Sequence, residues 1–403
     1  MRRFQSNGVF RINMDKRDFL WTSAALVAGA CFSQTVLAQR SLPPETVNNF
    51  NGVTLAAAWR QAQEGAEAKD FVGLLRADWD AAQVQVQAAL AVPSRAHGLL
   101  GVADGGFVAV ASRPGSWMVR CDAQGHAVQW LRMDSEAEGR TLDGHVCASV
   151  DGQWLYTAET HPHSGQGWVS VRDPVTLRKV AQWPTLGIGP HQLLLDASGA
   201  LMVANGGLLR AEGDKKRDLH LMDSSLVRLD PKTGQRLGQW RLKDSRLGIR
   251  HMAWSQPQGA ATGLAGTALL GIALQNEHDD VNQRRNSPVL ALWDGETLRT
   301  PSLSPAGGGY AGDIVAGPDG GFVLSCLRVN AALKWSPAEP EAMVNVALLR
   351  DVGALAPWAL SQESTGVLLG SARGVGRWHP RMAPVFLAWP GAMALDNHWI
   401  IVG

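Results

Sequence analysis

The chain has 403 residues, of which 45% are hydrophobic, 18% are charged and 44 are glycine. This length suits one large closed domain, and the many glycines suit a fold with many tight turns. Lysine and arginine (37) nearly balance aspartate and glutamate (36), and there is no run of basic residues. The composition therefore argues against a protein that binds nucleic acid through a concentrated basic face.

Residues 1–38 have the features of a signal peptide. The motif Lys16-Arg17-Asp18-Phe19-Leu20 resembles a twin-arginine export signal with lysine in place of the first arginine, and small residues permit cleavage after Ala38. The apolar run after the motif is too short to cross a bilayer, which takes about 20 residues. We therefore expect a periplasmic protein; Met14 is an alternative start and Cys31 an alternative site of lipidation.

Three cysteines, Cys121, Cys147 and Cys326, remain after cleavage. An odd number excludes a complete disulfide framework and leaves at least one free thiol. All three stand in apolar strand patterns, where cysteine is usually a small buried hydrophobe. A bridge between Cys121 and Cys147 is the alternative.

Residues 39–70 form an N-terminal arm without a clear pattern, in which residues 54–66 are compatible with a short helix. Two strands follow at 71–79 and 83–90, before the first repeat begins. The arm and these strands precede a domain that we place at residues 71–403.

From residue 97 onward, short stretches of alternating apolar residues separated by Gly, Asp and Pro turns recur in groups of four. The predicted groups are 97–103, 106–112, 117–122 and 127–133; 145–150, 154–159, 167–172 and 179–183; 191–196, 200–205, 225–230 and 236–242; and 251 onward with 268–275, 288–293 and 297–303. Tyr310 and Trp358 begin two more groups. The last group, 391–395 and 399–402, has only two strands.

Groups of four strands at this spacing predict an all-β fold, the β-propeller, with one sheet per repeat. Six groups are complete. We expect the two strands at 71–79 and 83–90 to pair with the two C-terminal strands and complete a seventh blade, which removes exposed sheet edges. The predicted fold is a seven-bladed propeller closed by its N-terminal strands, and we expect a monomer.

Four histidines stand at the head of the first strand in four successive groups. They are His97, His145, His191 and His251, which are 48, 46 and 60 residues apart. Because the first strand of each blade lines the central channel, these imidazoles should face one axis and form a metal site. Neutral imidazoles suit Fe(II), Cu(II) or Zn. The alternative is that each histidine only caps a strand with a backbone hydrogen bond.

Other polar residues are predicted on the same face as the histidines. Tyr310 and Trp358 take the histidine position in their blades, and residues that end the second strands should lie beside them: Arg113, Glu159, Asn205, Gln275 (or Asn276), Arg328 and Arg373. Glu159 could orient one histidine, and the three arginines could hold an anionic small molecule or metal chelate.

Two further segments could contribute to this face. His161-Pro162-His163 is either an auxiliary ligand pair or an exposed turn. The charged insertion at 206–224 is either a solvated loop or a lid, from which His220 could reach inward. The sequence has no nucleophile elbow, phosphate loop, haem-attachment motif or dinucleotide fingerprint.

Several of these segments resemble one family, the proteobacterial periplasmic propellers catalogued as domain of unknown function 1513. The segments are Gly144-His145, Leu155-Tyr156-Thr157-Ala158-Glu159, Gly187-Ile188-Gly189-Pro190-His191, Val203-Ala204-Asn205-Gly206-Gly207, Asp223-Ser224-Ser225-Leu226 and Ile249-Arg250-His251-Met252. The resemblance extends from about Ala96 to the C-terminus. The chain departs from the family pattern at Lys16-Arg17 and at His161-Pro162-His163.

The resemblance implies twin-arginine export and a gene neighbourhood of imelysin-like iron-regulated proteins and a dihaem oxidoreductase. It therefore implies periplasmic iron or copper handling, with periplasmic iron-uptake proteins as partners, although the family has no assigned activity. Two alternatives remain: a metal-dependent oxygenase or lyase that uses the four histidines, and a non-catalytic scaffold for protein interactions.

Overall fold

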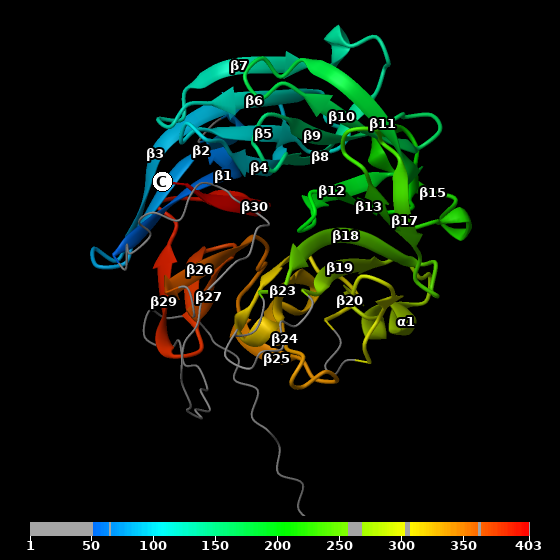
Figure 1. Cartoon of the computed structure of the whole chain (residues 1–403). Coiled ribbons are helices and arrows are strands. Elements are labelled where there is room, and N and C mark those ends of the chain that lie inside the picture. Colours follow the sequence, from blue (N-terminus) through cyan, green and yellow to red (C-terminus); the bar gives the residue numbers. More distant parts are fainter. Residues whose placement is uncertain (1–50, 64–65, 257–267, 303–306, 362–363, 403) are drawn as a thin grey trace, which may run out of the picture.

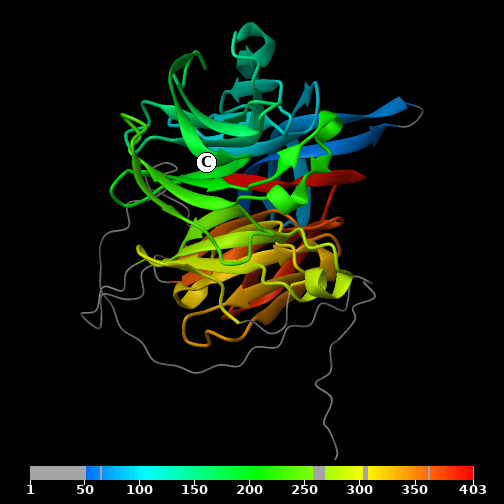
Figure 2. The same ribbon diagram turned by 90° about the vertical axis from the view of Figure 1, so that its right-hand side faces the viewer.

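Seven four-stranded antiparallel sheets are arranged as blades around one axis in the computed structural model (Figure 1, Figure 2). The structure describes residues 51–63, 66–256, 268–302, 307–361 and 364–402. The predicted signal peptide lies outside these residues. Within the described residues the predicted seven-bladed propeller is confirmed.

We number the six blades after the closing blade in chain order. Blade one contains β4 (Ala96–Gly101), β5 (Phe107–Ala111), β6 (Trp117–Cys121) and β7 (Ala127–Arg132); blade two β8 (Thr141–Ala148), β9 (Leu155–Thr160), β10 (Gln166–Arg172) and β11 (Lys179–Ile188); and blade three β12 (Pro190–Leu195), β13 (Leu201–Asn205), β16 (Ser225–Leu229) and β17 (Arg236–Trp240).

The remaining blades repeat this order. Blade four contains β18 (Leu247–Trp254), β19 (Leu270–Asn276), β20 (Leu290–Trp293) and β21 (Leu298–Arg299); blade five β22 (Asp313–Ala316), β23 (Phe322–Cys326), β24 (Ala331–Trp335) and β25 (Val344–Leu348); and blade six β26 (Leu355–Ser361), β27 (Ser364–Gly370), β28 (Gly374–His379) and β29 (Met382–Ala388). The second strand of a blade packs between two neighbouring blades, which explains why β5 is apolar and buried at every position.

The closing blade takes a different number of strands from each terminus than the sequence predicts. It contains β1 (Gly52–Gln63), β2 (Ala66–Asp78) and β3 (Gln83–Val92) from the N-terminal side, and β30 (Met393–Val402) from the C-terminal side. Figure 1 shows β30 (red) beside β1 (blue), and the two strands pair antiparallel from Thr54–Val402 to Gln61–Met393. Three strands plus one therefore close the ring, not two plus two.

The expected helix at 54–66 is wrong, and so is the boundary of the propeller at residue 71. The alanine-rich segment 55–59 was compatible with a helix because alanine has the highest helix propensity. In the structure its side chains alternate between two neighbouring cores: Leu55, Ala57 and Trp59 pack on one side, and Ala56 and Ala58 on the other. Tertiary packing between two blades outweighs the local propensity.

The C-terminal segment is one strand, β30, although the sequence predicts two strands at 391–395 and 399–402. Leu395 is opposite Trp59 and Trp399 is opposite Ala57, so three residues of β30 bulge out of the ladder. Asp396 accepts a hydrogen bond from the backbone N–H of Asn397, a local bond that is also typical of turns. The residues between the two predicted strands therefore form a β-bulge.

The same irregularity occurs in four other innermost strands. Each pairing with the second strand of its blade shifts register at a histidine: between Ala96 and Leu99, Leu142 and Val146, Pro190 and Leu193, and Ile249 and Met252. A bulge bends the strand and re-aims the side chain it carries. Each of the four predicted histidines therefore stands at a β-bulge in the innermost strand of its blade.

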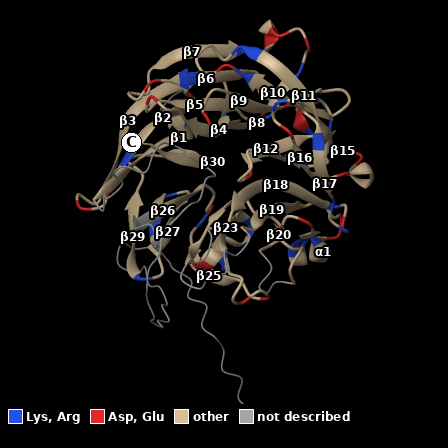
Figure 3. Cartoon of the chain, viewed as in Figure 1, with Lys and Arg blue, Asp and Glu red and all other residues tan. Residues whose placement is uncertain are grey.

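Insertions on blades three and four add a hairpin and a helix, and short 3-10 turns occur there and in other blades. β14 (Leu209–Arg210) and β15 (Lys216–Arg217) form a hairpin, and α1 (Val281–Asn286) follows β19. The 3-10 turns are η1 (Met133–Ser135), η2 (Glu212–Asp214), η3 (Leu219–Leu221), η5 (Pro318–Gly320) and η6 (Leu327–Val329). In the described part of the chain, no helix has the length and apolar character needed to span a membrane. Charges of both signs are scattered over the blades (Figure 3).

Candidate metal centre

Five histidines meet at the axis, each from the bulge of an innermost strand. They are His97, His145, His191, His251 and His398, which we call the axial cluster. Ring centroids of neighbouring members lie 4.4–4.8 Å apart. The four histidines predicted from the repeat are therefore brought together, and His398 joins them from the closing blade.

The ring nitrogens of the axial cluster are close enough to share one ion. Nε2 of His191 lies 3.3 Å from Nε2 of His145 and 2.7 Å from Nε2 of His251, and Nε2 of His398 lies 3.0 Å from Nε2 of His251. Two nitrogens bound to one ion at about 2.0–2.1 Å are about 3 Å apart at right angles and about 3.4 Å apart in a tetrahedron. The observed spacings cover that range.

Two overlapping sets of groups satisfy the geometry for an ion. One is His97, His145, His191 and His251, and the other is His251, Asp313 and His398; within each set the ligand atoms lie within 4.8 Å of one another. Because both sets contain His251, they describe neighbouring positions in one cluster. The first set offers nitrogen only, and the second adds one carboxylate oxygen.

Carboxylates orient two of the imidazoles. Oδ1 of Asp396 lies 2.6 Å from Nδ1 of His97, and Arg95 donates to the other oxygen of Asp396. Oδ2 of Asp313 lies 3.5 Å from Nδ1 of His398. A carboxylate at Nδ1 favours the tautomer that carries its proton there, which leaves the Nε2 lone pair free for a ligand bond.

Burial keeps most of the axial cluster neutral. Desolvation lowers the pKa of His97 to about 4, although Asp396 opposes the shift. Desolvation and the neighbouring charges lower the pKa of His145, His191 and His251 well below the ordinary value. His398 differs: burial lowers its pKa, but Asp313 outweighs burial and the net shift is upward. Unprotonated imidazole is the form that binds metal.

Two buried nitrogens of the axial cluster have no hydrogen-bond partner. They are Nδ1 of His191 and Nδ1 of His251. In both rings Nε2 faces another Nε2, a contact in which one nitrogen must carry the proton. A packed hydrophobic channel would need none of these groups, so the arrangement is not explained by folding alone.

Glycines allow the inner strands to approach each other at the axial cluster. A Cβ on Gly98 would lie 2.3 Å from the carbonyl oxygen of Gly144, and a Cβ on Gly144 would lie 3.0 Å from Cδ2 of His97. Gly144 also has φ +95°, a conformation that other residues rarely adopt. The glycines beside His97 and His145 therefore allow these two histidines to approach each other.

The eight other predicted ligand-binding residues separate into two groups. Arg113 and Gln275 border a small pocket beside His191, together with Arg210 and Arg250. Tyr310 lies next to this pocket, since it forms an isolated bridge with Gln275. The others have different surroundings.

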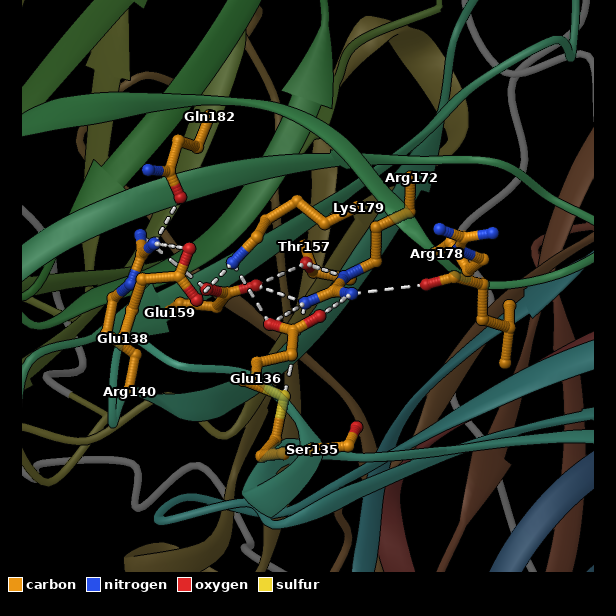
Figure 4. Close-up of polar contacts among 12 residues, drawn as sticks. Ser135, Glu136, Glu138, Arg140, Thr157, Glu159, Arg172, Arg178, Lys179 and Gln182 are labelled. Atoms are coloured by element: carbon orange, nitrogen blue, oxygen red, sulfur yellow. Dashed lines mark hydrogen bonds and ion pairs between the residues drawn. The ribbon is translucent and has the colours of Figure 1, made fainter.

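Glu159 belongs to a buried ion network and not to the histidines (Figure 4). Its Oε1 accepts from Nη2 of Arg172 at 2.6 Å, and both side chains are fully buried. Arg172 also binds Glu136, and Arg140 lies 3.7 Å from Oε2 of Glu159. The predicted role of Glu159 in orienting a histidine is therefore wrong, because two arginines take its carboxylate.

The remaining predicted residues are not among the groups that could hold an ion. Asn205 is buried in blade three, and it donates to the carbonyl oxygen of Thr185 in blade two and to the hydroxyl of Ser225 in its own blade. Arg328 is exposed and contacts the Tyr310 ring at 5.3 Å, and Arg373 is exposed. Trp358 packs in the core between blade six and the closing blade, with Arg377 over its ring at 4.7 Å. Its predicted place on the axis is wrong, since β26 turns this side chain toward a neighbouring blade.

The alternative ligands do not reach the axis. The rings of His161 and His163 lie 5.8 Å apart on a turn, where His161 contacts Ser164, and His220 is exposed on η3. The insertion contacts two neighbouring blades: Lys216 pairs with Glu277 of blade four at 2.6 Å, and Arg217 donates to the carbonyl oxygen of His163 in the loop after β9 of blade two. The lid stays a prediction.

Three groups of the site were not predicted: His398, Asp396 and Asp313. A signal for the first two exists in the sequence, since Asp396-Asn397-His398 before an apolar run parallels Asp143-Gly144-His145 before its own. Splitting residues 391–402 into two strands concealed it. Asp313 carries no comparable signal.

A family model described as a protein of unknown function (DUF1513) matches residues 90–402. No curated protein matches the chain. Solved structures with a similar fold include the Dos1 propeller (12% identity, 80% of this chain and 82% of that chain, TM-score 0.47) and hydrazine synthase of Kuenenia stuttgartiensis (14%, 66% and 72%, TM-score 0.47). A protein of unknown function from Bacteroides caccae is similar at 13% identity over 62% of this chain and 92% of that chain, with a TM-score of 0.37.

Proposed function

The chain belongs to DUF1513, a family of proteins of unknown function, and we propose that the axial cluster of this chain binds one transition metal ion. The observation that carries the proposal is the spacing of the Nε2 atoms, 2.7–3.3 Å between His145, His191, His251 and His398. Hydrogen bonding alone accounts poorly for so many imidazole nitrogens in contact, whereas a shared ion accounts for them all.

The donor set narrows the class of metal. Neutral imidazoles without thiolates suit Fe(II), Cu(II) or Zn, and they do not suit Mg²⁺ or Ca²⁺, which prefer oxygen. Our narrower proposal is iron or copper, handled in the periplasm after export through the predicted signal at residues 1–38. Four of the five histidines are buried and His398 is half-buried, so the ion would be held within the ring and not displayed on the surface.

Metal analysis of the mature protein tests the proposal. The protein is purified without chelators and compared with a His145→Ala/His191→Ala variant and with a His126→Ala/His220→Ala control, whose two histidines are exposed. We expect about one equivalent of iron or copper in the parent and the control and none in the cluster variant. Circular dichroism and thermal unfolding establish that each variant is folded.

A parent that is metal-free and takes up neither Fe(II), Cu(II) nor Zn(II) on titration would contradict the proposal. That result would favour the non-catalytic scaffold instead. Equal metal content in the parent and the cluster variant would also contradict it, because the ion would then be bound elsewhere.

Metal-dependent catalysis, by an oxygenase or lyase, is the second candidate function. The observation that favours it is the pocket bordered by His191, which would give a small molecule access to the axial cluster. Azide added to the metal-loaded protein tests for an open coordination position. A new ligand-to-metal absorption band supports this candidate, and an unchanged spectrum argues for a closed binding site.

A further inference from the structure

The pocket beside the axial cluster is bordered by three arginines from three blades. Arg113 follows β5 of blade one, Arg210 lies in the hairpin inserted into blade three, and Arg250 lies in β18 of blade four. His191 and Gln275 complete the polar part of the lining. Three guanidinium groups around one small pocket repel one another unless negative charge lies among them.

The carboxylates nearby do not balance these arginines. Asp214 serves two of them, since its carboxylate lies 3.4 Å from Nε of Arg113 and 2.9 Å from Nη1 of Arg210. Arg113 also approaches Asp143 at 3.9 Å. Arg250 donates to the neutral side chain of Gln275 at 2.6 Å. Among the residues that the structure describes, no carboxylate is within ion-pair distance of Arg250.

Hydrogen-bond donors are also left over in this region. Nε of Arg250 is buried and has no acceptor, and Nε of Arg113 is buried with only the ion-pair contact to Asp214 at 3.4 Å and no hydrogen bond. A buried charged donor without an acceptor is costly, and in native structures such a group usually signals a missing ligand, ion or water. Burial, together with Arg113, lowers the pKa of Arg210 to about 10, as expected where positive charge is in excess.

We propose that this pocket binds a small oxyanion, a carboxylate or a phosphate, held by Arg113, Arg210 and Arg250 beside His191. Guanidinium groups match both anions through paired hydrogen bonds. The sequence predicts Arg328 and Arg373 beside Arg113, whereas Arg210 and Arg250 border the pocket with Arg113 in the structure. Recognition by the arginines does not require metal in the axial cluster, so this proposal goes beyond the metal site and can fail separately from it.

Isothermal titration of the full mature chain with oxalate, and separately with inorganic phosphate, tests the proposal. The protein is first freed of metal and chelator and kept in a buffer without other carboxylates or phosphates. The variants are Arg250→Gln and, in the surface hairpin outside the blades, Arg210→Gln. The control is Arg241→Gln, an exposed arginine that pairs with Asp223 at 2.7 Å and does not line the pocket.

We expect oxalate or phosphate to bind the parent and the control equally, and both pocket variants to bind about 10- to 100-fold more weakly. The tighter of the two anions identifies the class of ligand. The proposal is overturned if neither anion binds the folded parent, or if both variants bind as the parent does. Metal content, measured on each purified protein before the metal is removed, reports on the axial cluster independently.

Discussion

Nδ1 of His97 lies 2.6 Å from Oδ1 of Asp396, although 299 residues separate them in the sequence. The contact joins blade one to β30 of the closing blade at the point where the ring is completed. Burial alone would raise the pKa of Asp396, but His97 and Arg95 hold it well below its usual range. The pair therefore closes the ring and orients one imidazole of the axial cluster.

Asp396→Asn should weaken metal binding without removing a ligand. Loss of the carboxylate at Nδ1 reduces the basicity of His97 and frees its ring to rotate, an effect of about 10- to 100-fold on affinity. Competition with a chelator of known affinity measures it. Asp122→Asn is the control, because Asp122 pairs with the exposed His126 at 3.3 Å. Equal affinities for both variants would show that Asp396 does not act through His97.

Acidification should destabilise the metal-free protein between about pH 6.5 and pH 4. Burial lowers the pKa of His97 to about 4 and lowers the pKa of the histidines of blades two, three and four further. Unfolded histidines take up protons near 6.5 while these folded ones do not. The unfolded state thus binds more protons in this range, and the free energy of unfolding falls as the pH falls.

Two groups act in the opposite direction: burial raises the pKa of Asp143 to about 7, and Asp313 raises the pKa of His398. Since four histidines oppose these two groups, the net slope should keep its sign. Urea denaturation from about pH 7.5 to about pH 4.5 measures it. The His145→Ala/His191→Ala variant should show a shallower slope; an equal slope would place the pH dependence outside the axial cluster.

Gly144→Ala should lower stability more than a substitution at a comparable glycine elsewhere. Gly144 has φ +95° and its new Cβ would press on the His97 ring at 3.0 Å, whereas Gly139 has φ +62° and open space around it. Gly139→Ala should lose about 1–2 kcal/mol from backbone conformation alone. A larger loss for Gly144→Ala in chemical denaturation, accompanied by weaker metal binding, would isolate the contact with His97; equal losses would contradict it.

Glu159→Leu should destabilise the fold by about 3–5 kcal/mol, because it leaves the fully buried Arg172 short of a partner. Arg172→Met should have a comparable effect. The double variant should lose clearly less than the two single losses added together, which a double-mutant cycle measures. Metal content should stay unchanged in all three. A loss of metal in Glu159→Leu would contradict this assignment and would indicate that Glu159 does support a histidine of the axial cluster.

Thiol reagents should fail to label Cys121 and Cys326 in the native protein. Burial raises the pKa of each thiol to about 12, and the thiolate is the reactive form. Ellman's reagent should react with these residues only after denaturation, which peptide mapping can assign. Cys147 is also free, so the Cys121–Cys147 bridge considered as an alternative is wrong. Rapid labelling of Cys121 under native conditions would mean that blade one opens locally.

The blades and four members of the axial cluster could be predicted because the same strand pattern, with histidine at the same position, recurs along the sequence. A histidine at one phase of four repeats must face one axis, whatever the details of each strand. Single residues were harder to place. Trp358 occupies the same sequence phase, yet blade six has no histidine-type bulge at that position, and the side chain packs between blades.

Features that depend on partners far away in sequence could not be predicted. The strand β1 looks helical until two neighbouring blades pack on its alternate faces. Glu159 looks like a site residue until Arg172 and Arg140 are placed beside it. Asp313 reaches His398 only across the ring. In each case the position of the residue depends on a tertiary contact, which the local sequence pattern cannot predict.

The bulge at Asp396–His398 has a consequence for the order of events during synthesis. Four histidines emerge from the ribosome within blades one to four, but the fifth, with the carboxylate that orients His97, arrives only with β30. Until then β1 also has an unpaired edge. The cluster is therefore complete only in a finished ring, so that metal capture would act as a checkpoint that discriminates closed molecules from nascent or truncated ones.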